Sequence, residues 1–287
     1  MKVLVTGSTG QLGKSILKIC NQFPELEIIP ITRGELDLSE LDSIASVLNK
    51  YAPEAIINTA AYTAVDKAEE EVELADTINH KAVKVIGEWC LDNNVKLIHI
   101  STDYVFDGNN KQPYTETDTP NPINIYGKSK CLGEQALLAL DIHNLAIVRT
   151  SWVWSEFGNN FVKTMLRLSS ERNEINVVND QFGSPTYAGD LAHALLLLVS
   201  KLSNKTSNTY HYCNAGVCSW FEFAKEIIAQ SNNTCQVNPI PSNQYKTAAK
   251  RAEYTALCNT FIKEQLSLEI PKWQISLQLG LKQITKF

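Results

Sequence analysis

The sequence predicts a doubly wound α/β fold, with a parallel sheet in the N-terminal half and a smaller C-terminal lobe. Short β-branched runs alternate with longer segments of helical periodicity over residues 1–150. The runs are almost continuously hydrophobic, which is typical of strands that helices cover on both faces. Three glycines, Gly7, Gly10 and Gly13, directly follow the first run. This alternation implies right-handed crossovers and an open, Rossmann-type parallel sheet.

Two lobes are expected, with a boundary near Ser151. The strands expected in residues 1–150 are Lys2–Thr6, Glu27–Thr32, Glu54–Thr59, Val95–Ser101 and Leu145–Thr150. The helices expected between them are Gln11–Gln22, Ser39–Tyr51, Val65–Asn93 and Tyr126–Leu140. The alternation is less regular in residues 151–287, where we expect helices at Asn159–Glu171, Gly189–Leu202 and Ser219–Ser231. We read these residues as a substrate-binding lobe, some segments of which return to the first lobe.

Composition excludes several classes of protein. The chain has 287 residues and a formal net charge of -5, so its overall field does not attract nucleic acid or an anionic membrane. Seven scattered cysteines with no Cys-x-x-Cys pair favour reduced thiols in the cytoplasm. A zinc site of Cys213, Cys218 and His211 would be the alternative, but it lacks the usual paired spacing. No segment resembles a signal peptide or has the roughly 20 apolar residues needed to span a bilayer.

The glycine cluster indicates a dinucleotide site. Glycines at a first strand–helix junction allow a tight turn, so that backbone N–H groups approach a pyrophosphate at the positive end of the helix. An acidic residue ending the second strand would favour NAD, whereas here Arg33 follows Thr32. Arg33 can meet a 2′-phosphate, with Asp37 and Leu38 at the adenine edge, unless it is an ordinary surface arginine. NADPH is therefore the predicted cofactor, with NADH as the alternative.

Further candidates follow the third and fourth strands. Ala60 and Ala61 are small enough for a cofactor to lie against the backbone, although this segment also reads as an ordinary strand-end turn. Thr102 is at the carboxyl end of the fourth strand, where ligands bind in such sheets. Tyr126 and Lys130, four residues apart, share one face of the next helix. An ammonium at about 5 Å would favour the phenolate by about 3 kcal/mol, or two pKa units, which suits a proton donor.

The motifs together resemble the dTDP-4-dehydrorhamnose reductase family of the extended short-chain dehydrogenase/reductase superfamily. The resemblance rests on GSTGQLG, AAYTAVDKAE, STDYVFDG, NIYGKSKCLGE, RTSWVW, NNFVKTMLRL, NDQFGSPTYAGDLA, SWFEFA and YKTAAKRAEYTAL, from Gly7 to Leu257. It implies reduction, by NAD(P)H, of the 4-keto group of dTDP-4-dehydro-6-deoxy-L-mannose to give dTDP-L-rhamnose. The implied partner is thus a small nucleotide sugar; a homodimer stays open.

The resemblance also assigns roles to residues. It implies that Tyr126 donates the proton, Lys130 holds the nicotinamide ribose and Thr102 hydrogen-bonds the reacting carbonyl. Residues that match the family's pyrophosphate loop and third-strand cofactor contacts are Gly10, Gln11, Leu12, Ala61, Tyr62 and Thr63. The predicted cofactor site also includes Gly7, Gly13, Ala60, Tyr126 and Lys130. Residues that match substrate contacts are Thr102, Asp103, Trp152 and Arg251, the last placed to meet the diphosphate.

The chain departs from the family pattern at a few positions. Ala252 replaces a usual proline after Arg251, and Cys258 replaces an acidic or amide residue. Ser15 and Gly189 are uncharged where some relatives carry glutamates associated with a metal, so no metal is predicted.

Three other functions are weighed against this one. A nucleotide-sugar dehydratase or epimerase would be expected to carry a glutamate where this chain has Tyr104, after Thr102-Asp103. A non-catalytic, NADP-binding regulatory subunit of the methionine adenosyltransferase type would not need Thr102, Tyr126 and Lys130, all present here. A reductase of a related 4-keto deoxysugar, or of another nucleotide, remains a third reading.

Overall fold

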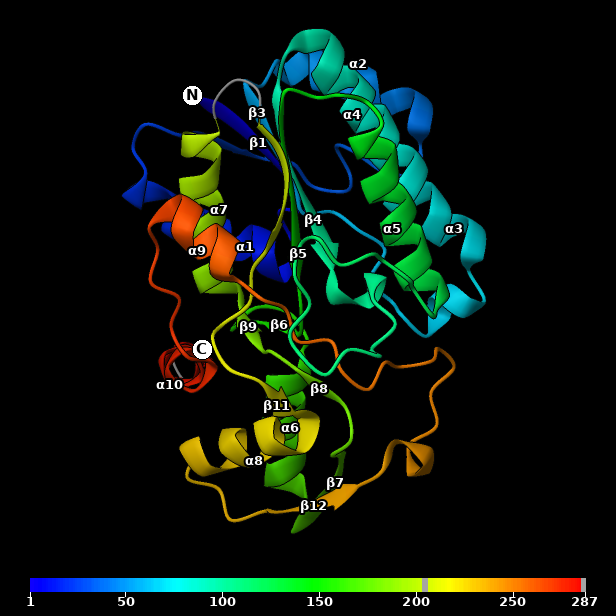
Figure 1. The fold of residues 1–287 in the computed structure, drawn as a ribbon. Coiled ribbons are helices and arrows are strands. Elements are labelled where there is room, and N and C mark those ends of the chain that lie inside the picture. The colour runs from blue at the N-terminus through cyan, green and yellow to red at the C-terminus, as the bar shows by residue number, and fades with distance from the viewer. Residues whose placement is uncertain (203–205, 285–287) are drawn as a thin grey trace.

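The larger lobe, in the upper half of the molecule as seen in Figure 1, is built on one parallel sheet. The computed structural model describes residues 1–202 and 206–284. Within them, six strands pair in the order β10-β5-β4-β3-β1-β2, and every pairing is parallel (Figure 1). Their bounds are β1 (Lys2–Thr6), β2 (Glu27–Pro30), β3 (Ala55–Asn58), β4 (Lys96–Thr102), β5 (Asn144–Thr150) and β10 (Thr206–His211). This order confirms the predicted doubly wound α/β class.

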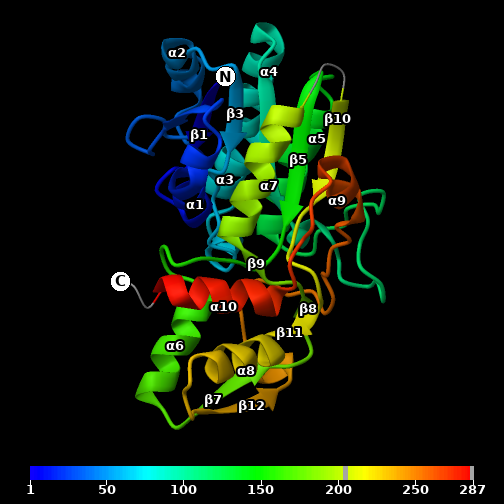
Figure 2. The same cartoon turned by 90° about the vertical axis from the view of Figure 1, so that its left-hand side faces the viewer.

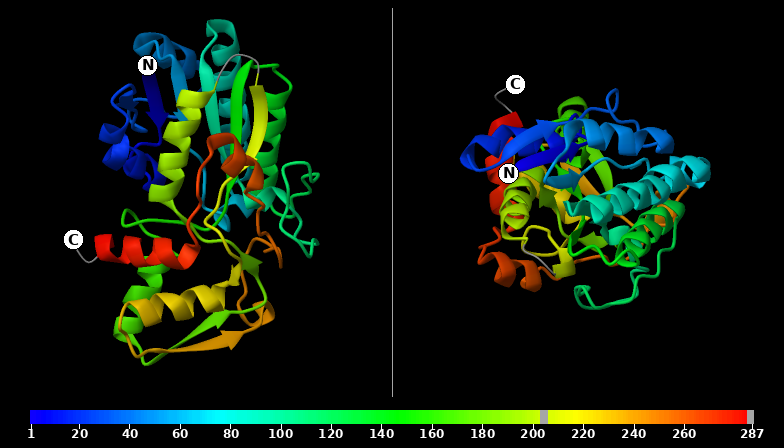
Figure 3. Two further views of the ribbon diagram at one scale, coloured as in Figure 1. Left: turned by 60° about the vertical axis from the view of Figure 1, so that its left-hand side comes forward. Right: turned by 90° about the horizontal axis from the view of Figure 1, so that it is seen from above.

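Helices cover both faces of the sheet because side chains alternate across it. Val3 and Val5 pack toward α1 (Gln11–Ile19), α7 (Ala188–Lys201) and α9 (Thr260–Leu266), whereas Leu4 packs on the other side. That side carries α2 (Leu41–Tyr51), α4 (Ala82–Asn93) and α5 (Ile125–Leu138) (Figures 1 and 3). Two apolar cores therefore sandwich the strands and hold their carboxyl ends in place.

A smaller lobe lies below the carboxyl ends of the strands (Figure 2). It contains α6 (Phe161–Glu171), α8 (Trp220–Gln230) and α10 (Trp273–Ile284) around a third apolar core. Its strands form three short pairs: β7 (Glu174–Val178) with β12 (Gln236–Ile240), β8 (Phe182–Gly183) with β11 (Cys218–Ser219), and β6 (Val153–Trp154) with β9 (Thr186–Tyr187). In Figure 2, α10 crosses between this lobe and the sheet.

Several elements differ from the sequence-based expectation. Strand β2 ends at Pro30 rather than Thr32. Proline is tolerated there because β2 is an edge strand and the N–H that Pro30 lacks would point away from β1, whereas Ile31 N still donates to Val5 O at 2.9 Å. The helix expected over Val65–Asn93 is broken into η2 (Lys67–Glu69), α3 (Val72–Asp76), a π-helical turn η3 (Thr77–Lys81) and α4. Strand β4 extends one residue further, to Thr102, and η4 (Asp103–Val105) follows it directly. A final short turn, η5 (Ser242–Gln244), lies in the lower lobe.

The chain returns to the sheet after α7. Strand β10 pairs with β5 from Thr206↔Asn144 to His211↔Arg149, so the smaller lobe begins, is interrupted and resumes. Helix α7 likewise packs against α1 on the sheet. In the described part of the chain, no helix combines the length and apolarity required to cross a membrane.

Candidate active site

A cavity of about 740 Å³ opens between the sheet and the lower lobe. We call its upper side the sheet wall, which is formed by the turn after β1 and by the ends of β3, β4 and α5. We call its lower side the lobe wall, formed mainly by Trp152, Phe161 and Trp220. The predicted residues that line the cavity are Gly7, Gly10, Gln11, Leu12, Arg33, Asp37, Leu38, Ala60, Ala61, Thr63, Thr102, Asp103, Tyr126, Lys130 and Trp152. Gly13, Tyr62 and Arg251 are not among them.

The glycine turn requires its glycines for reasons of space. Gly7 has φ +63°, and a Cβ there would lie 2.8 Å from Ala60 N. A Cβ on Gly13 would lie 2.4 Å from Gly7 O, so Gly13 supports the turn from beneath. Gly10 is the N-cap of α1 and provides no side-chain cap, which leaves the first N–H groups of the helix available to an anion. This cradle fits a dinucleotide pyrophosphate.

The backbone after β3 is clamped by a residue that the sequence did not single out. Asn79, in η3, accepts from Tyr62 N at 2.9 Å and donates to Tyr62 O at 3.0 Å. Its side chain also donates to Ser129 Oγ at 3.0 Å, which ties this segment to α5. The Tyr62 side chain donates to Glu71 at 2.7 Å, away from the cavity lining. The small residues Ala60 and Ala61 are thus presented to the cavity on a fixed backbone.

Arg33 lines the cavity just beyond the end of β2. Its Nε donates to Asp37 Oδ2 at 3.0 Å, and its side chain is 73% exposed. Asp37 also accepts from Ser39, and these hydrogen bonds hold the pKa of its carboxyl below the usual value. Arg33 and Asp37 therefore lie together in the cavity lining, next to the buried Leu38.

Tyr126 enters the cavity from the first turn of α5. The helix is capped by Asn124, whose Oδ1 accepts from Gly127 N at 2.8 Å. Gly127 lets this turn approach η4, since a Cβ there would lie 2.1 Å from Tyr104 O. Burial raises the pKa of Tyr126 to about 12; Asp103 adds to the rise and a hydrogen bond with Thr102 opposes it. This direction is opposite to the one expected from the Tyr-x-x-x-Lys spacing.

The reason lies in where Lys130 is held. Its Nζ donates to Ile100 O at 2.6 Å and lies 3.1 Å from His99 Nε2, so both of these contacts are with β4. Lys130 is buried, and burial lowers its pKa to about 8, with Glu134 opposing the change. The burial of Tyr126 therefore outweighs any tuning by the ammonium. At neutral pH the phenol keeps its proton, and most Lys130 side chains keep theirs.

Asp103 is fully buried beside Thr102. Its Oδ2 accepts from Thr255 Oγ1 at 2.6 Å, and its Oδ1 accepts from Thr102 Oγ1 at 3.1 Å. Burial raises the pKa of this carboxyl to about 6, although the two threonine hydrogen bonds lower it. Thr255 comes from the C-terminal part of the chain, so Asp103 joins η4 to the segment that carries Arg251.

The lobe wall is aromatic. Trp152 has φ +47°, and it stacks on Trp220 with ring centroids 3.5 Å apart. A Cβ on Gly183 would lie 2.7 Å from the Trp152 ring, so that glycine makes room for the indole. The sequence contains Trp220 within SWFEFA, but a tryptophan after a helix cap does not by itself indicate a cavity wall. Phe161, 4.6 Å from Trp220 between centroids, extends the surface.

Arg251 lies beside the main cavity. It lines a small hollow with Asp103, Tyr104, Trp152 and Trp220. Its guanidinium pairs with Asp66 at 2.8 Å and lies 5.7 Å from the centre of the Tyr104 ring. The only cationic side chain lining that hollow, in the described residues, is therefore already engaged with a carboxylate.

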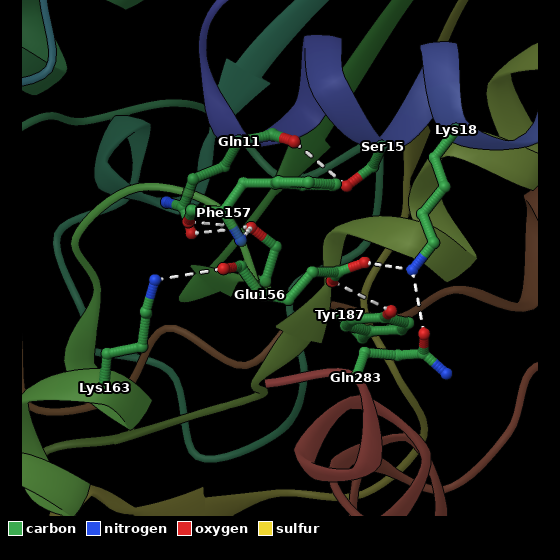
Figure 4. A network of polar contacts seen from close by, with 9 residues as sticks. Gln11, Ser15, Lys18, Glu156, Phe157, Lys163, Tyr187 and Gln283 are labelled. Carbon is green, nitrogen blue, oxygen red and sulfur yellow. Dashed lines mark hydrogen bonds and ion pairs between the residues drawn. The ribbon is translucent and has the colours of Figure 1, made fainter. Parts of the chain in front are cut away.

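The glycine turn is bonded directly to the lower lobe (Figure 4). Gln11 Oε1 accepts from Asn160 Nδ2 at 2.9 Å and from Ser155 Oγ at 3.2 Å. Nearby, Lys18 of α1 pairs at 2.6 Å with Glu156, which also accepts from Tyr187 at 3.0 Å (Figure 4). These contacts hold α1 against the part of the smaller lobe that lies nearest the sheet.

The structure places the suggested metal and thiol residues as follows. Ser15 Oγ donates to Gln11 O at 2.9 Å. Across residues 1–202 and 206–284, no three His, Cys, Asp or Glu side chains converge as a metal site would require. All seven cysteines are free thiols.

Comparison with known proteins identifies the family. Residues 1–286 match the family model described as the RmlD substrate binding domain. The chain belongs to this family. A dTDP-4-dehydrorhamnose reductase of Aggregatibacter actinomycetemcomitans is 40% identical over 96% of this chain and 97% of its own length. The Escherichia coli (strain K12) enzyme of that name is 35% identical over 99% of this chain and 98% of its own length.

Solved structures agree with the family assignment. The dTDP-4-dehydrorhamnose reductase of Bacillus anthracis, crystallised in complex with NADP, has a TM-score of 0.93 and 40% identity, covering 98% of this chain and 99% of that one. An orthologue from Clostridium acetobutylicum also has a TM-score of 0.93, at 37% identity over 99% of this chain and all of that chain. Homology and fold together therefore identify this chain as an NAD(P)H-dependent oxidoreductase of the RmlD family.

Proposed function

We propose that the protein reduces the 4-keto group of dTDP-4-dehydro-6-deoxy-L-mannose, giving dTDP-L-rhamnose. Full-length relatives bearing the name dTDP-4-dehydrorhamnose reductase support this activity. The single structural observation that carries it is the meeting of Thr102, Tyr126 and Lys130 on one wall of the cavity. A phenol that still holds its proton at neutral pH is the form that a reductase needs.

NADPH is the proposed cofactor, and when bound it supplies the hydride. Gly7, Gly10, Gln11 and Leu12 would receive its pyrophosphate, on the uncapped start of α1. Arg33 would meet the 2′-phosphate, while Asp37 and Leu38 would border the adenine. The alanines after β3, together with Tyr62 and Thr63, would line the remainder, and Gly13 would support the turn. NADH stays the alternative.

Three residues carry the proposed chemistry. Tyr126 donates its hydroxyl proton to the substrate oxygen as negative charge develops there. Thr102 would donate its hydroxyl hydrogen to the same oxygen, in place of the bond that it makes here to Asp103 Oδ1. Lys130, in its ammonium form, would hold the nicotinamide ribose and place a positive charge beside it.

Residues 151–287 supply most of the proposed substrate lobe, and residues 1–150 the cofactor lobe. Trp152 would offer an apolar surface to the sugar or base, and Asp103 would accept from a sugar hydroxyl. Arg251 would leave Asp66 for the substrate diphosphate, which bears more charge and accepts bidentate hydrogen bonds. Ala252, in place of the family's proline, packs against Gly108, where a Cβ would lie 2.6 Å from Ala252 Cβ.

We also propose that the protein acts in the cytoplasm, because seven free thiols suit a reducing compartment. Its partner is a small nucleotide sugar, and a homodimer stays a prediction.

The direct test is NADPH oxidation with enzymatically made dTDP-4-dehydro-6-deoxy-L-mannose. Turnover with this sugar, and much weaker turnover with its UDP analogue, is the expected result. Replacing Arg33 with methionine should raise the KM for NADPH about 10-fold and leave that for NADH unchanged, because one charged hydrogen bond to phosphate is lost. No turnover with any dTDP 4-keto sugar would refute the proposal.

One second candidate has specific support. A dTDP-4-keto-6-deoxy-D-glucose reductase of Streptomyces niveus is 34% identical over 96% of this chain. Measuring both 4-keto sugars in the same assay, with product stereochemistry read by NMR, separates the two. A regulatory subunit without catalysis would bind NADPH and oxidise none with either sugar.

A further inference from the structure

A chain of buried polar side chains runs from β1 to Lys130 through the interior of the sheet. Thr6 Oγ1 donates to Asn58 Oδ1 at 2.6 Å. Asn58 Nδ2 lies 3.1 Å from His99 Nδ1, and His99 Nε2 lies 3.1 Å from Lys130 Nζ. All four side chains are at least 95% buried, and His99 lies outside the cavity lining. A row of four such groups in an apolar sheet requires that every donor meet an acceptor.

The hydrogens in this chain can be assigned from its first member. Thr6 Oγ1 accepts from Ala60 N at 3.2 Å and donates its one hydrogen to Asn58 Oδ1 at 2.6 Å. The amide nitrogen of Asn58 then faces His99 Nδ1, which must accept. A neutral imidazole that accepts at Nδ1 carries its hydrogen on Nε2. That hydrogen points at Lys130 Nζ, and only an unprotonated amine can accept it.

The imidazole is neutral in this site. Burial and the adjacent Lys130 both push the pKa of His99 well below its usual value. A neutral ring can nevertheless serve a lysine ammonium as well, provided that its hydrogen moves to Nδ1 and leaves Nε2 free to accept. Asn58 must then turn its oxygen toward the ring, and the hydroxyl of Thr6 loses its acceptor. The two charge forms of Lys130 thus require two arrangements of the same chain.

Other charges around Lys130 do not decide between these arrangements. On its own helix, Glu134 is held by Arg149 of β5 at 2.6 Å, so its charge is largely balanced. Tyr126, one turn earlier, keeps its proton. Asp103, in η4, is hydrogen-bonded to two threonines and interacts with Tyr126. His99 is the polar side chain in direct contact with Nζ.

We propose that His99 is a positioning residue whose ring hydrogen follows the charge of Lys130: it lies on Nε2 beside the amine and on Nδ1 beside the ammonium. The imidazole holds one hydrogen in both arrangements, and the proton that Lys130 gains comes from solvent through the cavity. In the arrangement with the ammonium, the Thr6 hydroxyl has no acceptor for its hydrogen. The row of buried polar side chains therefore favours the amine form of Lys130. This adds to the burial that lowers the pKa of Lys130. The upper pH limit of catalysis is then set by a residue that touches neither substrate nor cofactor.

The first test reads the ring directly. The chain has five histidines, so a ¹⁵N-histidine NMR spectrum is simple, and the His99→Gln variant identifies the His99 signals. As the pH rises from 6 to 10, the protonated nitrogen of the His99 ring should change from Nδ1 to Nε2, with a midpoint near pH 8. The ring should stay neutral throughout, with no imidazolium formed. The other four histidines report on the fold in the same spectrum. The same tautomer at both ends of the range would overturn the proposal.

The second test fixes the His99 ring in one tautomer. In Asn58→Asp, a carboxylate can only accept, so it should hold the hydrogen on Nδ1 at every pH and leave Nε2 to accept from the ammonium. The alkaline limb of kcat/KM should move up by about one pH unit, and about five times as much activity should survive at pH 9. A limb that stays near the wild-type position would contradict the proposal, whatever the change in Tm.

This inference rests on the proposed roles of Tyr126 and Lys130 only in its kinetic part. If the wild-type protein turned over no 4-keto sugar, the proposed function would fail, and the NMR titration would still decide the role of His99.

Discussion

The two walls of the cavity are built differently. On the sheet wall, Lys130 and Thr102 are buried and Tyr126 is half-buried, and hydrogen bonds to the backbone and to neighbouring side chains hold them in place. The lobe wall consists of stacked rings, and Arg251 lies beside it in the adjoining small hollow, paired with an Asp66 side chain that is 47% exposed. The difference teaches that chemistry and recognition are separated, so substitutions on the two walls should affect different kinetic constants.

The largest effect is expected on the sheet wall, from Tyr126→Phe. Loss of the proton donor should lower kcat at least ~100-fold, whereas the Kd for NADPH, measured by fluorescence, should stay the same. Tyr245→Phe, which alters an exposed tyrosine, is the matched control. Wild-type turnover in Tyr126→Phe would remove the phenol from the mechanism and erase the distinction between the walls.

The next effect concerns stability at the sheet wall. Because the folded pKa of Asp103 is about 6 and the unfolded value is near 3.8, the carboxyl stabilises the fold below about pH 4 and this contribution is lost as the pH rises through 6. Asp103→Asn removes the titration, so its free energy of unfolding relative to wild type should rise by about 2 kcal/mol from pH 4 to pH 7. Denaturant unfolding at the two pH values measures it. A difference that does not change with pH would show that Asp103 is ionised without penalty.

In the hollow beside the lobe wall, Arg251→Met should raise the KM for the dTDP sugar at least ~10-fold and change kcat little, since a charged hydrogen bond to the diphosphate is lost. Arg167→Met removes an exposed arginine of α6 and serves as the control. Equal losses in kcat would mean that Arg251 acts on the reacting groups, contrary to the division between walls.

The smallest effect is expected for Trp220→Leu. Without its stacking partner, Trp152 loses an aromatic contact of about 1 kcal/mol, and the KM for the sugar should rise about fivefold. Trp89→Leu removes an indole from α4, on the far core of the sheet, and should lower Tm without changing KM. If both variants behave alike, the Trp152–Trp220 stack is structural only.

Prediction from sequence worked where the backbone itself imposes the residue. The turn at Gly7 needs a positive φ and no Cβ, and Tyr126 and Lys130 lie one helical turn apart in α5, so the cradle and the Tyr126–Lys130 pair could be located in advance. Strand β10 was missed because its residues are largely polar, as an edge strand permits.

The remaining misses depend on tertiary contacts. The pKa of Tyr126 is governed by burial, which residue spacing does not reveal. Three residues that the sequence did not single out contact partners far away in the chain: Trp220 with Trp152, Asn79 with Ser129, and His99 with Lys130. A single sequence contains no signal that pairs them.

The side chain of Gln11 has a consequence for how the two ligands sense each other. It belongs to the turn proposed to meet the pyrophosphate, yet it is hydrogen-bonded to Asn160, the N-cap of α6 in the other lobe. An event at one ligand can thus be transmitted to the other as a coupling free energy, and thermodynamic linkage makes that coupling reciprocal. The factor by which bound coenzyme increases the affinity for the sugar nucleotide must equal the factor by which bound sugar nucleotide increases the affinity for the coenzyme. Removing the Gln11–Asn160 hydrogen bond should reduce both factors together.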